Sequence, residues 1–141
     1  MAADPIEVAR RHDEAWNTKD VEGRKAVAAP DLVLEMPGGM VLKGLDQVLQ
    51  VEAAFWTALP DSQVQAASTY VDGDTVITEG TASGTHTGPI ITPQGEVPPS
   101  GNPVNLRYVS VKTVVGGKLV AEHLYFDQME FMMQLGAMPQ S

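Results

Sequence analysis

The sequence has no cysteine, few basic residues and no long apolar run. Without cysteine the chain cannot form disulfides, thiolate nucleophiles or cysteine-based zinc sites. Its 9 Lys and Arg stand against 18 Asp and Glu, and the longest basic run is Arg10-Arg11, so neither nucleic acid nor an anionic membrane is an expected partner. No apolar stretch approaches the roughly 20 residues of a membrane span. The first five residues lack the basic and apolar regions of a signal peptide, so we expect a cytoplasmic protein.

The length and composition are those of one globular domain. The 141 residues fit a single domain, residues 1–141, that can bury a substantial core. Hydrophobic residues make up 43% of the chain and charged residues 19%, which excludes a disordered or fibrous protein.

Helical signals dominate the first part of the chain. Asp4-Pro5 predicts a helix start, because Asp is a good N-cap and Pro suits the first helical position. The apolar spacing predicts helices over residues 6–17, about 21–29 and 45–59, and a strand over 32–36.

After residue 62 the apolar period changes from about 3.6 to about 2, which indicates strands. Expected strands cover residues 63–71, 75–87, 106–115 and 118–126, with hairpin turns at Asp72-Gly73-Asp74 and Gly116-Gly117. Residues 88–103 are rich in Gly and Pro and predict a long loop of the kind that often serves as a lid. Helices first and strands afterwards indicate an α+β fold with a curved antiparallel sheet.

The last hairpin suggests where chemistry lies. If Val115 pairs with Lys118 and the register continues, one face of the hairpin collects five side chains that can carry chemistry. These are Tyr108, Ser110, His123, Tyr125 and Asp127. The plainer alternative is that this face is simply the solvent side of the sheet.

Two further histidines are candidates. His86 lies where the long strand meets the loop and is a candidate acid, base or oxyanion partner, or else a surface residue that caps a turn. His12 shares an apolar helical stripe with Val8 and Trp16, so a buried core histidine is at least as plausible as a functional one. The histidine spacings match no metal motif, and we expect no metal or other cofactor.

Several short segments follow one another in a recognisable order along the chain. They are Ala15-Trp16-Asn17-Thr18-Lys19-Asp20, Ala29-Pro30-Asp31, Pro60-Asp61, Asp72-Gly73-Asp74, Gly84-Thr85-His86-Thr87-Gly88, Pro99-Ser100-Gly101-Asn102-Pro103-Val104, Gly117-Lys118-Leu119-Val120, Tyr125-Phe126-Asp127 and Gln134-Leu135-Gly136. Together they resemble the SnoaL-like polyketide cyclases over residues 6–139. The resemblance implies the cone-shaped fold shared with nuclear transport factor 2 and ketosteroid isomerase, in which helices and a strongly bent sheet enclose a pocket.

The resemblance also implies a cofactor-independent mechanism. Family members close a polyketide ring by an intramolecular aldol step with one aspartate as acid and base, and the matching position is Asp127. His86 and His123 are then catalytic candidates that stabilise or protonate the oxygen.

The same resemblance suggests a substrate site. Its expected residues are His12, Trp16, Trp56, Tyr108 and Tyr125. Steroid isomerisation is not expected, because His12 stands where the isomerases have their oxyanion tyrosine and Met36 where they have their catalytic aspartate.

Two other functions stay open at this stage. The scaffold could be a non-catalytic small-molecule-binding protein, because a fold does not fix a function. It could also be an interaction domain whose C-terminal Met129, Met132, Met133 and Met138 form an apolar contact. We favour an acid/base enzyme acting on a small apolar or polyketide-like carbonyl compound, with those methionines sealing the cavity or a homodimer interface.

Overall fold

A computed structural model describes residues 4–92 and 95–137. Four helices and eight strands follow one another in this part of the chain. Their order is α1 (Pro5–Thr18), α2 (Val21–Ala26), β1 (Ala28–Met36), β2 (Met40–Lys43), α3 (Leu45–Ala58), β3 (Gln63–Asp72), β4 (Thr75–Thr85), β5 (Ile90–Thr92), β6 (Gly95–Val97), β7 (Pro103–Val115), β8 (Lys118–Phe126) and α4 (Gln128–Gln134).

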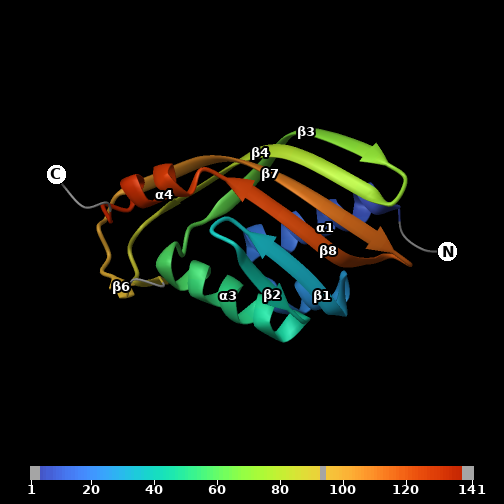
Figure 1. Ribbon diagram of the computed structural model, residues 1–141, viewed down its shortest axis with the longest axis horizontal. Coiled ribbons are helices and arrows are strands. Elements are labelled where there is room, and N and C mark those ends of the chain that lie inside the picture. Colours follow the sequence, from blue (N-terminus) through green and yellow to red (C-terminus); the bar gives the residue numbers. More distant parts are fainter. Residues whose placement is uncertain (1–3, 93–94, 138–141) are drawn as a thin grey trace.

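Six of the strands form one curved sheet in the order β2-β1-β8-β7-β4-β3. All neighbouring pairs are antiparallel except β1 and β8, which run parallel. In Figure 1, α1 lies behind the sheet and α3 runs beside β1 and β2, so both helices cover the same side. The expected α+β architecture is confirmed, and the helices and sheet leave an inner face on which a pocket can form.

Local signals set the start of α1 as expected, but not the end of α2. The Asp4 side chain accepts a hydrogen bond from the Ile6 N–H at 2.9 Å, and Pro5 occupies the first helical position. The second helix is shorter than predicted and ends at Ala26, because the carbonyl of Val27 accepts the Leu119 N–H and the chain enters β1 at Ala28. Pairing with β8 therefore overrides the helical tendency of residues 27–29.

Two short elements lie outside the prediction. Strand β2 follows the Pro37-Gly38-Gly39 turn and pairs with β1 at the sheet edge. The segment 88–103 is not a simple loop, because β5 and β6 form a small hairpin within it. The C-terminal methionine-rich segment forms the short helix α4, while Met138 lies outside the described residues.

A β-bulge in the last hairpin reverses the predicted faces. Val115 pairs with Lys118 and Val114 with Leu119 as expected, but Thr113 then pairs with Ala121, so Val120 has no opposite partner. Such an extra residue shifts every later pair by one and turns the strand over. Tyr108 therefore faces Phe126, and His123 faces Val111.

The core consists of two clusters of buried hydrophobic residues. One joins α1, β1, α3 and the start of β8 through residues that include Val8, Leu32 and Leu119. The other joins the end of α3, the 88–103 segment, β7 and α4, and includes Leu59 and Phe131. No helix in the two described ranges is long and apolar enough to cross a membrane.

Candidate functional site

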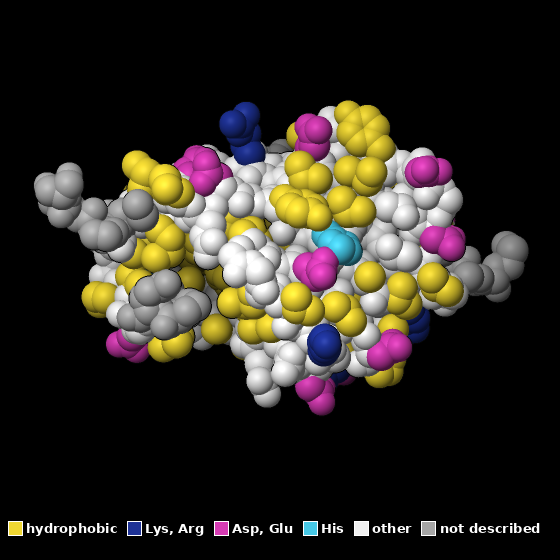
Figure 2. Space-filling model, viewed as in Figure 1, with side chains coloured by type: hydrophobic (Ala, Val, Ile, Leu, Met, Phe, Trp, Pro, Cys, Tyr) yellow, Lys and Arg dark blue, Asp and Glu magenta, His cyan; other side chains and the backbone are white. Residues whose placement is uncertain are grey.

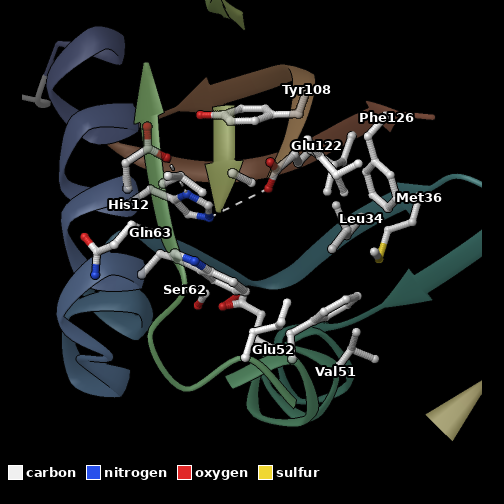
Figure 3. Close-up of a pocket in the computed structure, with 18 of the residues that line it drawn as sticks. His12, Leu34, Met36, Val51, Glu52, Ser62, Gln63, Tyr108, Glu122 and Phe126 are labelled. Carbon is white, nitrogen blue, oxygen red and sulfur yellow. Dashed lines mark ion pairs between the residues drawn. The ribbon is translucent and has the colours of Figure 1, made fainter. Parts of the chain in front are cut away.

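A pocket of about 160 Å³ lies between the inner face of the sheet and helices α1 and α3. Its walls are mostly apolar, with a group of polar and charged side chains at one end. In Figure 3 the polar residues His12, Glu122, Ser62 and Glu52 lie toward α1, and Leu34, Met36 and Phe126 lie at the opposite side. A cavity of about 150 Å³ can hold one benzene ring, so a single small ring fits this space.

The sheet supplies one polar wall through β7 and β8. Tyr108, Ser110, Lys112 and Glu122 all point to the inner face and are buried, because the bulge places Glu122 opposite Lys112. The Lys112 ammonium donates to the Ser110 Oγ at 2.8 Å and lies 3.5 Å from a Glu122 oxygen. This buried cation therefore balances the charge of Glu122.

Helix α1 brings His12 and Asp13 beside that wall. The His12 Nε2 lies 3.7 Å from Glu122 Oε1, and its Nδ1 lies 3.7 Å from Asp13 Oδ1 (Figure 3). Burial raises the pKa of Asp13, the Lys112 charge opposes the shift and the Glu122 charge adds to it. A carboxyl whose pKa is raised toward neutrality is better matched to proton transfer near neutral pH.

The other polar wall joins α2 to α3. Arg24 and Glu52 are each only 4% exposed and form a bidentate ion pair, in which Arg24 Nε donates to Glu52 Oε2 at 2.7 Å and Arg24 Nη2 donates to Glu52 Oε1. Burial raises the pKa of Glu52, and the Arg24 hydrogen bond opposes that shift. Ser62, also buried, lines the pocket next to these residues.

Several polar atoms of the pocket residues have no hydrogen-bond partner in the part of the chain that the structure describes. They are both ring nitrogens of His12, Trp16 Nε1, Arg24 Nη1, Ser62 Oγ and Tyr108 Oη. Buried polar groups are nearly always hydrogen-bonded, so such a set in one cavity indicates groups that meet a ligand or solvent. Burial and the nearby charges of Asp13 and Glu122 raise the pKa of Tyr108 well above its usual range, so its hydroxyl stays a donor.

Three of the expected substrate-site residues do lie in the pocket. His12, Trp16 and Tyr108 line it. Trp56 stands outside the lining and packs against Trp16, with ring centroids 5.3 Å apart, so it supports the pocket wall from behind.

The hairpin face expected to carry Tyr108 and Ser110 together with His123, Tyr125 and Asp127 is split by the bulge, and that expected grouping is wrong. The bulge turns His123 and Tyr125 to the outer face, where the His123 Nδ1 lies 2.6 Å from Glu35 Oε2 and Tyr125 is 55% exposed. Asp127 follows β8, is exposed, and caps α4 by accepting the Glu130 N–H at 3.0 Å. A catalytic role of Asp127 therefore has no support from its position.

His86 has a structural setting instead of a place in the pocket lining. It is fully buried, and its Nδ1 accepts the Ser100 N–H at 3.2 Å and lies 2.9 Å from the Ser100 Oγ. Its backbone also exchanges hydrogen bonds with Gly101 and Asn102. Burial lowers the pKa of His86, so the neutral imidazole holds the 88–103 segment in place.

Sequence reasoning missed Asp13, Arg24, Glu52, Lys112 and Glu122. Asp13 carried a usable signal, because it lies four residues after Ala9 and three before Trp16 on the buried stripe of α1. Lys112 is the one charged residue among residues 108–115 of β7, which also marks a special position. No group of three or more metal-ligating side chains occurs among residues 4–92 and 95–137.

Comparisons with known proteins agree with this architecture. A family model described as SnoaL-like polyketide cyclase matches residues 6–135. A comparison with curated proteins finds no significant match.

Solved structures with the same fold include proteins with different described chemistry. A SnoaL-like polyketide cyclase candidate from Jannaschia sp. CCS1 has a TM-score of 0.85 at 23% identity, covering 96% of this chain and 93% of its own. IdmH from Streptomyces antibioticus, described as a candidate polyketide cyclase, has a TM-score of 0.80 at 27% identity, covering 95% and 99%. AclR from Streptomyces galilaeus, described as a candidate hydroxylase, has a TM-score of 0.82 at 23% identity, covering 100% and 86%. The fold is thus common to all three, and the pocket must decide the chemistry.

Proposed function

Because the chain belongs to the SnoaL-like polyketide cyclase family, we propose that its inner pocket is the active site of an acid/base enzyme that needs no cofactor. The substrate is a small, largely apolar carbonyl compound, and the reaction begins with removal of a proton from the carbon next to a carbonyl group. Intramolecular aldol closure is the form of this reaction that the family suggests.

The observation that carries the proposal is the isolation of Asp13. Three carboxylates line the pocket, and two of them have a cationic partner: Glu52 pairs with Arg24 and Glu122 with Lys112. Among the described residues, Asp13 has no Lys or Arg within ion-pair distance and meets only the His12 ring at 3.7 Å. An unpaired carboxylate with a raised pKa at the polar end of an apolar pocket is suited to act as a general base.

The neighbouring groups complete the reaction. As Asp13 takes the proton, negative charge moves to the carbonyl oxygen of the substrate. The Tyr108 hydroxyl and the His12 ring are unpaired donors on the same side of the pocket, and they stabilise this oxygen as an enolate. The enolate carbon then attacks a second carbonyl carbon of the same molecule, and the proton held by Asp13 passes to the new alkoxide.

The test measures proton removal directly. Exchange of the methyl protons of acetophenone for deuterium, followed by NMR, reports the first step without knowledge of the natural substrate. Asp13→Asn should slow the exchange by about 100-fold or more while the fold is retained. Asp127→Asn is the matched control, because Asn caps a helix as well as Asp does, and it should leave exchange unchanged. Loss of exchange in Asp127→Asn with full exchange in Asp13→Asn would reverse the assignment.

A binding protein without catalysis is the second candidate. The ion pairs of Glu52 and Glu122 favour it, because they neutralise most of the charge that a reaction could use. On this alternative, acetophenone binds to the pocket and its methyl protons exchange no faster than in buffer.

We also propose that the chain forms a homodimer through the outer face of the sheet. Figure 2 shows hydrophobic side chains gathered on this face. One row crosses all six strands in register and consists of Val41, Glu35, His123, Val111, Ile77 and Tyr70. Glu35 is the one acidic residue in the row and lies 2.6 Å from the His123 ring, so two copies of this acidic chain can meet here without strong repulsion.

A further inference from the structure

The pocket has a second set of unpaired polar groups, on the wall opposite Tyr108. We propose that Arg24 and Ser62, with the indole N–H of Trp16 from the same pocket lining, form a recognition site for a second oxygen of the ligand. The ligand is then a ring compound with oxygen functions on two opposite edges, not a simple ketone. This inference rests on the proposal that the pocket binds a carbonyl compound, and it concerns binding only.

The donors that define this site are buried and unused. Ser62 is 5% exposed and Arg24 4% exposed, and both line the pocket. Arg24 Nη1, Ser62 Oγ and Trp16 Nε1 have no hydrogen-bond partner among the residues the structure describes. Two of these atoms are pure donors and the third can donate, so the group that fits them is an acceptor oxygen.

The Arg24–Glu52 ion pair prepares the site for that oxygen. Glu52 engages Nε and Nη2 of the guanidinium, which fixes the plane of the group and leaves Nη1 as its free end. A buried ion pair is weak support for stability alone, because apolar residues in its place are often as stable. Its presence in a pocket wall is better explained if the free end of the guanidinium binds a ligand.

Position separates this site from the one that would hold the reacting carbonyl. In Figure 3, Tyr108 and Glu122 lie on the sheet side of the pocket, and Ser62 and Glu52 lie on the side of α3. A ring that fills the space between them presents one edge to each wall. A phenolic hydroxyl suits the α3 side, since it can accept from Arg24 or Ser62 and donate to Glu52.

Two small ketones test this inference. Acetophenone has one oxygen, and 4′-hydroxyacetophenone adds a hydroxyl at the opposite edge of the same ring. The protein should bind the hydroxylated ketone at least about 10-fold more tightly, measured by calorimetry or by NMR titration. Ser62→Ala and Arg24→Lys should each remove most of this preference and leave the affinity for acetophenone unchanged. Arg24→Lys keeps a cation beside Glu52 and removes the free Nη1 donor.

The controls separate the inference from the proposed chemistry. Ser68→Ala, in β3 and outside the pocket lining, should keep the full preference. Asp13→Asn should slow proton exchange by about 100-fold or more and still prefer the hydroxylated ketone, so failed catalysis does not imitate a failed binding site. Equal affinity for both ketones in the unmodified protein, an unchanged preference in both Ser62→Ala and Arg24→Lys, or no binding of either ketone at millimolar concentration would overturn the inference.

Discussion

Removal of the Arg24 guanidinium should destabilise the protein far more than replacement of the whole ion pair. In Arg24→Met, the Glu52 carboxylate remains buried, with 6% of its side-chain surface exposed, and loses the bidentate partner that compensates its charge. Breaking one side of a buried ion pair costs about 3–5 kcal/mol. Domains of this size have a total stability of about 5–15 kcal/mol, so a large share of it would be lost.

The double variant Arg24→Met/Glu52→Met is the matched control. It places apolar side chains of similar volume in the same space, and such replacements are often neutral or stabilising by about 1–4 kcal/mol. Urea unfolding followed by tryptophan fluorescence and circular dichroism gives both free energies, and thermal melts should show a drop of roughly 10–20 °C for the single variant only. The two variants together measure the cost of the uncompensated carboxylate.

The pH dependence supplies an independent check on the cause. Burial raises the pKa of Glu52 above its usual 4.5, so the folded state holds a proton more tightly than the unfolded state does. The loss of stability in Arg24→Met is therefore greatest at pH values above the pKa that Glu52 has in the folded state. It declines as the pH falls through that pKa and vanishes below about 4.5, where the carboxyl is protonated in both states. The reasoning is refuted if the single variant lies within about 1 kcal/mol of the double variant, or if its penalty does not change with pH.

Three further predictions concern the rest of the fold. Burial lowers the pKa of His86, so as the pH falls the unfolded state takes up the proton of this imidazole before the folded state does. The stability of the fold should therefore decrease as the pH drops below 6.5. His86→Gln should reduce this dependence of the melting temperature on pH in thermal melts between pH 5 and 8. Gly88→Ala should destabilise the protein by about 3 kcal/mol or more, because an added Cβ would lie 2.0 Å from the Thr57 carbonyl oxygen. Gly39→Ala is the comparison variant: its Cβ would enter open space, so only the left-handed φ of 75° should cost about 1–2 kcal/mol in the same melts. If the outer face of the sheet is a dimer interface, Tyr125→Lys should convert a dimer to a monomer in light scattering, because Tyr125 is exposed on that face. A monomeric parent protein would refute the interface.

Much of the fold could be predicted because its signals are local. A capping aspartate before a proline set the start of α1, and the Asp72-Gly73-Asp74 and Gly116-Gly117 turns set two hairpins. The end of α2 was wrong, since the residues after Ala26 pair with β8, more than ninety positions later in the chain. Partners at such distance leave no mark in the local pattern of apolar residues.

The side chains that face the pocket were harder to predict, because their faces on β8 depend on Val120, the bulge residue that has no partner across the hairpin. The bulge at Val120 is formed by pairing across the hairpin, and it exchanges the faces of every residue that follows it on β8. A continuous register therefore put His123 in the pocket and Glu122 outside, and the structure has the reverse. The error reversed the faces of every later residue on β8 and so removed the register argument that grouped Asp127 with His123 and Tyr125.

The polar pocket wall also reverses the usual assignment of strand faces, in which apolar side chains point to the core and polar ones to solvent. On β7, the residues that point inward are Tyr108, Ser110 and Lys112, while Val109 and Val111 point outward. Alternation alone would bury the valines, because apolar side chains usually face the core. The valines can stay at the outer face if a second copy covers it, and the buried lysine can stay inside because Glu122 pairs with it. Pocket chemistry and the apolar outer face are thus two consequences of one strand pattern. The double variant Lys112→Met/Glu122→Met, which makes β7 and β8 apolar at this point of the inner face, should still fold, because neither buried charge is left without its partner.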